Sequence, residues 1–452
     1  MFRKIRKLFL RPNEYCYDYF RKRLGFKKYF VTEKIRLLDS GNHHKWVKLL
    51  FTHPSLYLYY KFNKRLRKPA YPILVNYQVK TVQENFIGSD RGKSKALAVE
   101  LENGNIIYFA EPEMVLKVLD GLEPNLSGYI FKLRFHGHEN KVFIDAGVQF
   151  NQGFNVTFEG SNNCIYLGYG SVFHSDGLIS FKGNSNIIRI GPYCRSGQHV
   201  QVLLMGNCNT IETKNSATFG HDTVIIHKEN NNYSYFGSYA SVSSNSNLCL
   251  KGDNAISYIC DCVSLGTSNI QIGSGSIFFV STRSSAGNNF RCFLFDAKNI
   301  IIGADCLIHQ NVYLENGTGQ AIYDAQSKER IYNSDSIIIG DHVCVNVNSY
   351  ILKGVIIGGG SIIGIGSVVT ESIQDRCLAV GSPAAVMHKN ILWTNDVQEN
   401  TLCIKQKNPD YFTDLKETGL DKLKKIDKIS LDLDTNKKID IINQIINENI
   451  FS

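Results

Sequence analysis

The polar stretch at residues 315–333, "ENGTGQAIYDAQSKERIYN", interrupts two aliphatic runs and contains side chains that could take part in chemistry. Asp324 offers a carboxylate and Thr318 a hydroxyl. The amide of Gln320 neither takes up nor releases a proton near neutral pH. Histidine does so, and His309 shortly precedes the stretch. One hypothesis is a proton-transfer site that uses His309, and the other is that this histidine is an ordinary surface or corner residue.

Other reactive patterns are weaker. His342 and His388 are also near the stretch in sequence, whereas His221 and His227 belong to earlier segments. We find no Ser–His–Asp pattern and no pair of carboxylates at a catalytic spacing. The twelve cysteines form no CxxC pair, and "CDC" at 260–262 is poorly spaced for zinc. We therefore expect no metal site, and we expect reduced thiols in a cytosolic protein.

The elements that must position these residues form a repeat. Six segments starting at 133, 156, 179, 202, 225 and 248 follow one another every 23 residues. Their fifth position is mostly glycine and their eighth mostly asparagine, as in Gly137, Gly160, Gly183, Gly206 and Gly252, and in Asn140, Asn163, Asn186, Asn209 and Asn232. Six copies in one register predict a stacked repeat architecture.

From residue 300 the aliphatic positions recur every six residues, as in Ile339, Val345, Ile351, Ile357 and Ile363. Period six is neither helical nor a simple strand alternation. It predicts a three-sided parallel β-solenoid with one interior aliphatic residue per side. The 23-residue units are then 18-residue coils with a five-residue corner excursion. We expect Gly and Asn to provide positive φ at that corner, and stacked Asn side chains to form a hydrogen-bonded ladder.

Residues 336–373, "SIIIGDHVCVNVNSYILKGVIIGGGSIIGIGSVVTESI", and 378–393, "LAVGSPAAVMHKNILW", resemble the hexapeptide-repeat acyltransferase family. The resemblance implies a mainly β fold, a left-handed parallel β-helix. It is strongest to the branch that O-acetylates polysaccharides or sugar-nucleotide-linked precursors, and so implies a role in the biosynthesis of capsule or lipopolysaccharide. The 23-residue units at 133–270 look like the N-terminal coils of capsule-type members.

The family resemblance also implies partners and site residues. It implies a homotrimer that uses acetyl-CoA as co-substrate, a sugar or polysaccharide acceptor, and a histidine base on a loop that leaves the helix. Catalytic positions then fall on Thr318, Gln320, Asp324 and His309. Cofactor-binding positions fall on Cys344, Asn346, Lys353, Gly364, Gly366, Ser382, Pro383 and Lys389. For the two lysines, ordinary surface charge is the alternative.

The chain departs from the family pattern at the predicted site. The family's Ile-x-Asp element is kept at Ile322–Asp324, but Gln320 stands where the family has its histidine and Thr318 where it has an aspartate. Cys344 and Asn346 replace a usual Trp and Gly. Two functions follow: an acetyl-CoA-dependent O-acyltransferase with an altered base, or an inactive scaffold or glycan-binding member of a capsule assembly complex.

The flanking segments complete the domain organisation. We predict a basic helical arm at 1–70, a small α/β cap at 71–130, the β-helix at 131–393 and a polar helical tail at 394–452. Net charge is +9, and residues 1–36 hold twelve Lys/Arg against three acids, with aromatics interleaved. This arm either packs on its own domain or lies on an anionic membrane, at the inner face of the bacterial membrane.

Nucleic acid is a less favoured partner for the arm, because no recognition motif accompanies the charge. The sequence contains no run of 18 uncharged apolar residues, so we expect no transmembrane helix. The N-terminus lacks the features of a secretory signal. A different transferase reaction carried by the first 130 residues is the third functional alternative, and no motif supports it.

Overall fold

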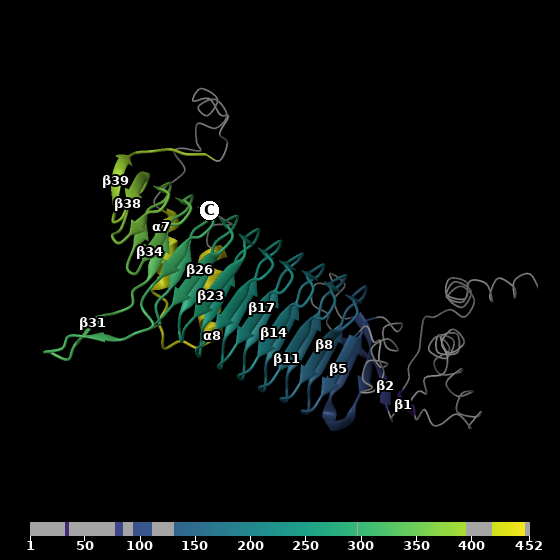
Figure 1. Cartoon of the computed structure of the whole chain (residues 1–452). Helices are drawn as coiled ribbons and strands as arrows, with labels where there is room; N and C mark the ends of the chain where they lie inside the picture. Colours follow the sequence, from purple (N-terminus) through teal and green to yellow (C-terminus); the bar gives the residue numbers. More distant parts are fainter. Residues whose placement is uncertain are drawn as a thin grey trace, which may run out of the picture.

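The computed structural model of the 452-residue chain describes residues 32–35, 77–84, 94–110, 131–295, 297–394 and 418–447. Its centre is a parallel β-solenoid with three sides, shown lengthwise in Figure 1. We name the sides sheets A, B and C. Each coil runs from sheet A to sheet C to sheet B, so that the coils turn at an A–C, a C–B and a B–A corner.

Sheet A consists of β1 (Thr32–Ile35), β2 (Tyr77–Glu84), β3 (Ser94–Glu100), β4 (Ile106–Phe109), β6 (Lys141–Ile144), β9 (Cys164–Leu167), β12 (Ile187–Ile190), β15 (Thr210–Thr213), β18 (Tyr233–Phe236), β21 (Ile256–Ile259), β24 (Ile277–Val280), β27 (Ile300–Ile302), β32 (Ile337–Ile339) and β35 (Ile356–Ile357). Sheet B consists of β5 (Phe131–Phe135), β8 (Phe154–Phe158), β11 (Leu178–Phe181), β14 (Gln201–Leu204), β17 (Val224–His227), β20 (Asn247–Leu250), β23 (Ser268–Ile272), β26 (Phe290–Leu294), β29 (Tyr313–Glu315), β34 (Tyr350–Leu352) and β37 (Val368–Val369). Sheet C consists of β7 (Gln149–Phe150), β10 (Val172–Phe173), β13 (Arg195–Ser196), β16 (Thr218–Phe219), β19 (Ser241–Val242), β22 (Ser264–Leu265), β25 (Ser285–Ala286), β28 (Leu307–Ile308), β33 (Cys344–Val345), β36 (Ile362–Ile363), β38 (Cys377–Gly381) and β39 (Ala384–Lys389).

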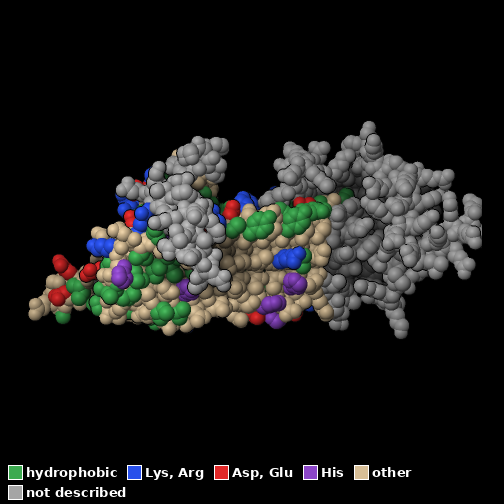
Figure 2. Space-filling view, turned by 90° about the horizontal axis from the view of Figure 1, so that it is seen from above, with side chains coloured by type: hydrophobic (Ala, Val, Ile, Leu, Met, Phe, Trp, Pro, Cys, Tyr) green, Lys and Arg blue, Asp and Glu red, His purple; other side chains and the backbone are tan. Residues whose placement is uncertain are grey.

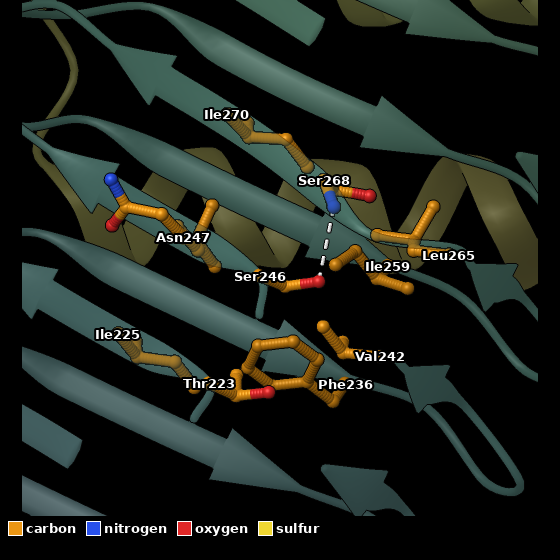
Figure 3. Close-up of a pocket in the computed structure, with 11 residues that line it drawn as sticks. Thr223, Ile225, Phe236, Val242, Ser246, Asn247, Ile259, Leu265, Ser268 and Ile270 are labelled. Atoms are coloured by element: carbon orange, nitrogen blue, oxygen red, sulfur yellow. Dashed lines mark hydrogen bonds between the residues drawn. The ribbon is translucent and has the colours of Figure 1, made fainter. Parts of the chain in front are cut away.

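The strand register confirms both predicted periods. Cys164 pairs with Ile187 and Ile187 with Thr210, a step of 23 residues, whereas Ile338 pairs with Ile356, a step of 18. Aliphatic and aromatic side chains fill the interior, and Figure 3 shows a narrow apolar cavity among them in the middle coils. Each coil therefore buries its apolar residues against its neighbours.

The five-residue excursion lies at the B–A corner, and its glycines serve another purpose than the one predicted. Gly160 and Gly183 do not have positive φ; a Cβ on Gly160 would lie 2.0 Å from the carbonyl oxygen of Gly183. The glycines are required because successive coils approach closely at this point. Positive φ falls instead two residues later, as at Asn162 and Ser185.

The asparagine ladder is confirmed and has a specific geometry. The Oδ1 atom of Asn163 accepts a hydrogen bond from the backbone N–H of Asn186 (2.9 Å), and Asn186 accepts one from Asn209 in the same way (2.9 Å). These side chains are fully buried. The ladder thus satisfies one backbone donor per coil at a corner where no strand provides an acceptor.

An antiparallel meander precedes the first coil. Strands β1 to β4 pair in sequence, and β4 pairs in parallel with β6 and so covers the start of sheet A. A single 3-10 turn, η1 (Glu102–Gly104), joins β3 to β4. Thr32–Ile35 is a strand where we predicted helix, since β2 offers these residues a hydrogen-bonding edge. The rest of the basic arm and residues 111–130 of the predicted α/β cap lie outside the described residues.

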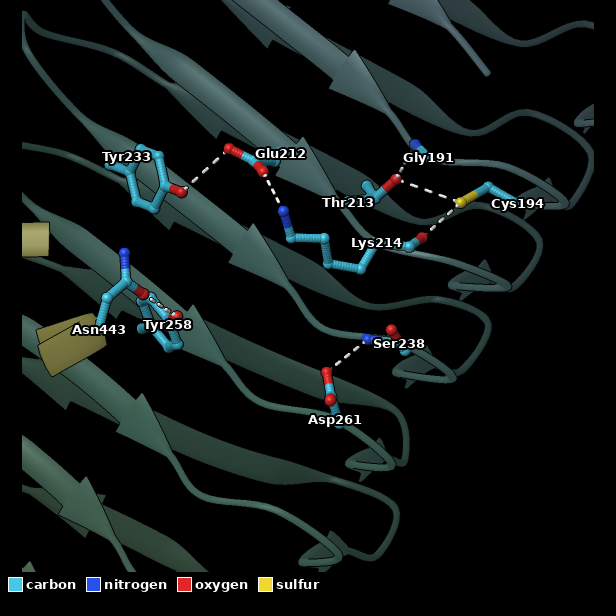
Figure 4. A network of polar contacts seen from close by, with 10 residues as sticks. All are labelled: Gly191, Cys194, Glu212, Thr213, Lys214, Tyr233, Ser238, Tyr258, Asp261 and Asn443. Atoms are coloured by element: carbon cyan, nitrogen blue, oxygen red, sulfur yellow. Dashed lines mark hydrogen bonds and ion pairs between the residues drawn. The ribbon is translucent and has the colours of Figure 1, made fainter. Parts of the chain in front are cut away.

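Two C-terminal helices, α7 (Thr418–Asp427) and α8 (Thr435–Asn447), pack behind sheet A in Figure 1. The Tyr258 hydroxyl donates to Oδ1 of Asn443 (2.6 Å; Figure 4), and the Asn299 amide donates to the Asp427 carboxylate (2.9 Å). Ile442 of α8 is fully buried. The predicted helical tail therefore packs on its own solenoid.

No helix in the described ranges is long and apolar enough to cross a bilayer.

Candidate functional site

The stretch 315–333 leaves the solenoid at the B–A corner, the same corner that carries the five-residue excursions in earlier coils. It forms an antiparallel hairpin of β30 (Ile322–Tyr323) and β31 (Arg330–Tyr332), which projects from the end of sheet B in Figure 1. Ile322, Tyr323 and Ile331 are exposed along it. The interruption is thus an ordered hairpin that projects outward.

The base of the hairpin is held by polar contacts. Asn316 is fully buried, and its side chain accepts from the Phe295 N–H (2.8 Å) and donates to the Lys298 carbonyl (2.9 Å). The Lys353 ammonium donates to the carbonyl of Asn333 (2.7 Å). Lys353 therefore holds the chain where it leaves the hairpin and re-enters the solenoid. It does not lie with the other residues that we predicted to bind a cofactor.

Inside the hairpin the predicted catalytic residues have structural contacts. The Thr318 hydroxyl donates to the Gln320 carbonyl (2.7 Å), and the Gln320 side chain is exposed. The Asp324 carboxylate accepts from the backbone N–H groups of Ser327 (2.7 Å) and Gln326 (2.9 Å), which lower its pKa. Asp324 consequently builds the hairpin turn.

His309 lies at the C–B corner, directly after the interior Ile308. Its backbone N–H donates to the Val345 carbonyl (2.9 Å), and that of Asn346 donates to Ile363 (3.0 Å). His309 and Asn346 therefore occupy equivalent positions in adjacent coils, with Gly364 next. The imidazole of His309 is half-buried, and no described residue hydrogen-bonds to it.

The other histidines have different surroundings. The His342 ring stacks on Trp393 at 4.0 Å, and its Nε2 lies 3.2 Å from the Trp393 carbonyl. His388 is exposed on β39, and Nδ1 of His221 accepts from the Gln198 N–H (3.0 Å). His227 is fully buried inside the solenoid, where desolvation lowers its pKa to about 3. None of these four has the combination of access and position that His309 has.

The remaining predicted cofactor residues gather at the last coils. Cys344 belongs to β33, and burial raises the pKa of its thiol to about 11. Asn346 donates its amide to the Ile363 carbonyl (2.9 Å). Ser382 and Pro383 are exposed in the turn between β38 and β39, and Lys389 is exposed at the end of β39. Gly364 and Gly366 follow β36 at the C–B corner.

One of these positions is open to solvent. A Cβ on Gly366 would meet nothing within 4 Å, and this glycine has a φ of +66°. Outward residues in register on sheet C become apolar toward the same end of the solenoid, namely Leu307, Cys344, Ile362 and Leu378. Figure 2 shows hydrophobic side chains gathered at that end. This end of sheet C therefore presents an apolar surface, and Lys389 is exposed on β39, which pairs with β38 at its edge.

The structure separates the predicted residues into two groups. His309, Asn346, Gly364 and Gly366 lie at the C–B corner, and Gln320 lies on the hairpin at the B–A corner. Sheet B stands between them. The sequence did not reveal this separation or the hydrogen bond from Lys353 to the base of the hairpin, because neither follows from the repeat. Among the described residues no cluster of three metal-binding side chains occurs.

No family model matches the chain. It is 34% identical over 119 residues to the polysialic acid O-acetyltransferase of Escherichia coli O1:K1 / APEC, which covers 26% of this chain and 38% of that protein. It is 33% identical over 101 residues to the galactoside O-acetyltransferase of Lactococcus lactis subsp. lactis, covering 22% and 48%. The chain thus spans less than half of the length of these two relatives.

Two solved structures are similar to parts of this chain. The crystal structure of the polySia-specific acetyltransferase NeuO matches with 26% identity and a TM-score of 0.43, covering 53% of this chain and 92% of that one. The polysialic acid O-acetyltransferase OatWY matches with 28% identity and a TM-score of 0.44, covering 46% and 99%. Over about a quarter of its sequence, the chain is similar to sugar O-acetyltransferases, and its own fold is a left-handed parallel β-helix.

Proposed function

We propose that the chain is an O-acetyltransferase of cell-surface polysaccharide biosynthesis. The observation that carries this proposal is its sequence similarity to polysialic acid and galactoside O-acetyltransferases. In the reaction a sugar hydroxyl attacks the thioester carbonyl of acetyl-CoA. The C–O ester bond forms, the C–S bond breaks, and the products are an acetylated sugar and free CoA.

We assign the general base to His309. A base must take the proton of the attacking hydroxyl near neutral pH, and Gln320 cannot do so. His309 is half-buried, its ring is not engaged by any described residue, and it adjoins Asn346 and Gly364 of the proposed acetyl-CoA surface.

Acetyl-CoA would lie along the C–B corner of the last coils. The open space at Gly366 would admit it, the apolar outward residues of sheet C would contact its pantetheine arm, and Lys389 would meet a phosphate. The hairpin lies across sheet B from this surface. A homotrimer would let the hairpin of one subunit reach the acetyl-CoA surface of the next, and we include this arrangement in the proposal.

An inactive scaffold or glycan-binding protein is the second candidate, favoured by the exposed Gln320 and by the use of Asp324 in a turn. A direct assay separates the two. The full chain is incubated with radiolabelled acetyl-CoA and either polysialic acid or a galactoside, and CoA binding is measured by calorimetry. If the chain binds CoA but transfers acetyl groups to neither acceptor, the second candidate is favoured. If the chain does not bind CoA and transfers no acetyl groups, the first candidate is refuted.

The role of His309 has its own test. If His309 is the base, His309→Ala lowers the transfer rate by about 10²- to 10⁴-fold with little change in CoA affinity. His388→Ala, which changes an exposed histidine on β39, is the matched control. Equal rates for the two variants would exclude His309 as the base.

A further inference from the structure

The outward face of sheet B is free of the C-terminal helices, which pack behind sheet A (Figure 1). One column of outward residues on this face is in register through five successive strands, from β20 to β34. It consists of Asn247, Asn269, Arg291, Tyr313 and Tyr350, and we call it the B strip. Neighbouring strands lie 4.7–4.9 Å apart, so the B strip is about 19 Å long.

The C-terminal half of the B strip is a stack of flat groups. The Tyr313 and Tyr350 rings stack at 4.7 Å with 14° between their planes, and the Arg291 guanidinium lies 5.1 Å from the centre of the Tyr313 ring. Tyr350 is 42% exposed. Among the described residues no further ring packs on Tyr350, so part of this ring is open to a ligand.

The N-terminal half of the B strip is composed of amides. Oδ1 of Asn247 is buried and has no hydrogen-bond partner among the described residues, and Figure 3 shows its amide directed away from the apolar cavity. Asn269 accepts from the Gln271 amide (3.3 Å) on the same face. The Asn269 amide and the adjacent Arg291 guanidinium therefore offer an acceptor and donors side by side.

Cations outnumber acids among the outward residues on the strands of sheet B. Arg291 is exposed, its Nε donates to Asn289 Oδ1 (3.1 Å), and no described carboxylate pairs with it. Lys132 and Arg134 are the other cations on these strands, and Glu315 is the acid. The B–A corners of the earlier coils are mixed in charge, with Lys182, Lys228 and Lys251 beside Glu139, Glu159, Glu229 and Asp253.

We infer that the B strip is a binding site for an extended anionic polysaccharide, which it holds for delivery to the hairpin. The inference rests on the proposed function, because the bound chain is the acceptor. Arg291 would bind a sugar carboxylate with a bidentate geometry, the Asn269 amide would bind a hydroxyl, and the open face of Tyr350 would pack on the apolar side of a sugar ring.

The position of the strip fits this role. Tyr313 belongs to β29, which ends at Glu315, and the hairpin with Gln320 begins directly after it. A chain lying along the strip would reach the base of the hairpin. Several weak contacts in a row favour a polymer over a short oligosaccharide, because each further sugar binds intramolecularly.

Binding is measured with the full chain by calorimetry, with no acetyl-CoA present. The probes are polysialic acid, neutral dextran and a single-stranded DNA of similar length. We expect polysialic acid to bind, dextran to bind at least tenfold more weakly, and affinity for polysialic acid to fall with added salt. Tighter binding of the DNA than of polysialic acid would overturn the assignment to polysaccharide.

Two variants and two controls locate the site. Arg291→Gln and Tyr350→Ala each weaken polysialic acid binding about fivefold to tenfold. Arg195→Gln on sheet C and Tyr239→Ala at the A–C corner remove an exposed side chain of the same type elsewhere, and each leaves affinity within about twofold of the parent protein. Equal weakening by the controls, or none by the strip variants, would overturn the proposal.

The transfer reaction is then assayed separately on the same variants. Loss of polysaccharide binding in a protein that never transfers acetyl groups would support the B strip and refute the proposed function. Normal transfer with unchanged binding in Arg291→Gln and Tyr350→Ala would refute the B strip alone.

Discussion

We predict that His227 makes the stability of the solenoid depend on pH in the acid range. It is fully buried on sheet B, its Nε2 lies 2.8 Å from the Ser234 hydroxyl, and its Nδ1 has no partner among the described residues. Protonation would add a positive charge and a second N–H group in apolar surroundings without an acceptor for it. Burial therefore lowers the pKa from 6.5 to about 3.

The size of the effect follows from the two pKa values. Between pH 6.5 and pH 3 the unfolded chain binds a proton at His227 that the folded chain does not, so stability falls as pH falls through this window. Linkage gives a loss of about 2 kcal/mol at pH 5 and about 5 kcal/mol below pH 3, relative to neutral pH. Above pH 6.5 the contribution is constant.

His227→Leu isolates this contribution. The register partners of His227 in the adjacent coils are Leu204 and Leu250, both fully buried, so a leucine fits the column. Urea unfolding is followed by circular dichroism at about pH 7.5 and about pH 5 for both proteins. We expect the variant to lose about 2 kcal/mol less than the parent between these two conditions.

Other titrating groups are common to both proteins and cancel in the comparison. Removing the imidazole also leaves the Ser234 hydroxyl without this partner, which lowers the stability of the variant equally at both pH values. An identical pH dependence for parent and variant would refute the argument that His227 is buried in the neutral form.

Two further predictions concern the corners. Gly183→Ala places a Cβ 2.0 Å from the Gly206 carbonyl oxygen and should lower the free energy of unfolding by about 2 kcal/mol. Gly319→Ala is the control, because a Cβ there meets nothing within 4 Å. Equal thermal midpoints for the two variants would contradict the explanation that the coils approach closely at Gly183. Lys353→Met removes the hydrogen bond to Asn333 at the base of the hairpin. Limited proteolysis should then cut the hairpin faster than in the parent, while Lys389→Met leaves the rate unchanged; unaltered cleavage would show that Lys353 does not hold the hairpin.

Much of the fold could be predicted because the repeat is visible along the chain. Each coil repeats the same interior aliphatic positions and the same corner residues, so the 23- and 18-residue steps predicted which strands pair. The reason for the corner glycines was predicted incorrectly. Their role depends on the distance between successive coils, which a sequence position does not specify.

The candidate site was less predictable. The spacing marked residues 315–333 as an interruption, and the side-chain chemistry of Gln320 excluded it as a base. Whether Asp324 acts in catalysis or in a turn depends on which N–H groups face its carboxylate. In the structure these are the backbone groups of Gln326 and Ser327.

The stacked β-helix, its two periods and the position of the interruption at 315–333 follow from the sequence alone, because the pattern recurs along the chain and breaks at that point. Which side chains become neighbours across coils is visible only in the folded protein. Folding placed His309 beside Asn346, tied Lys353 to the hairpin and aligned Arg291 with Tyr313 and Tyr350. Such contacts join residues separated by one coil and any insertion within it, so they exist only after the coils have stacked.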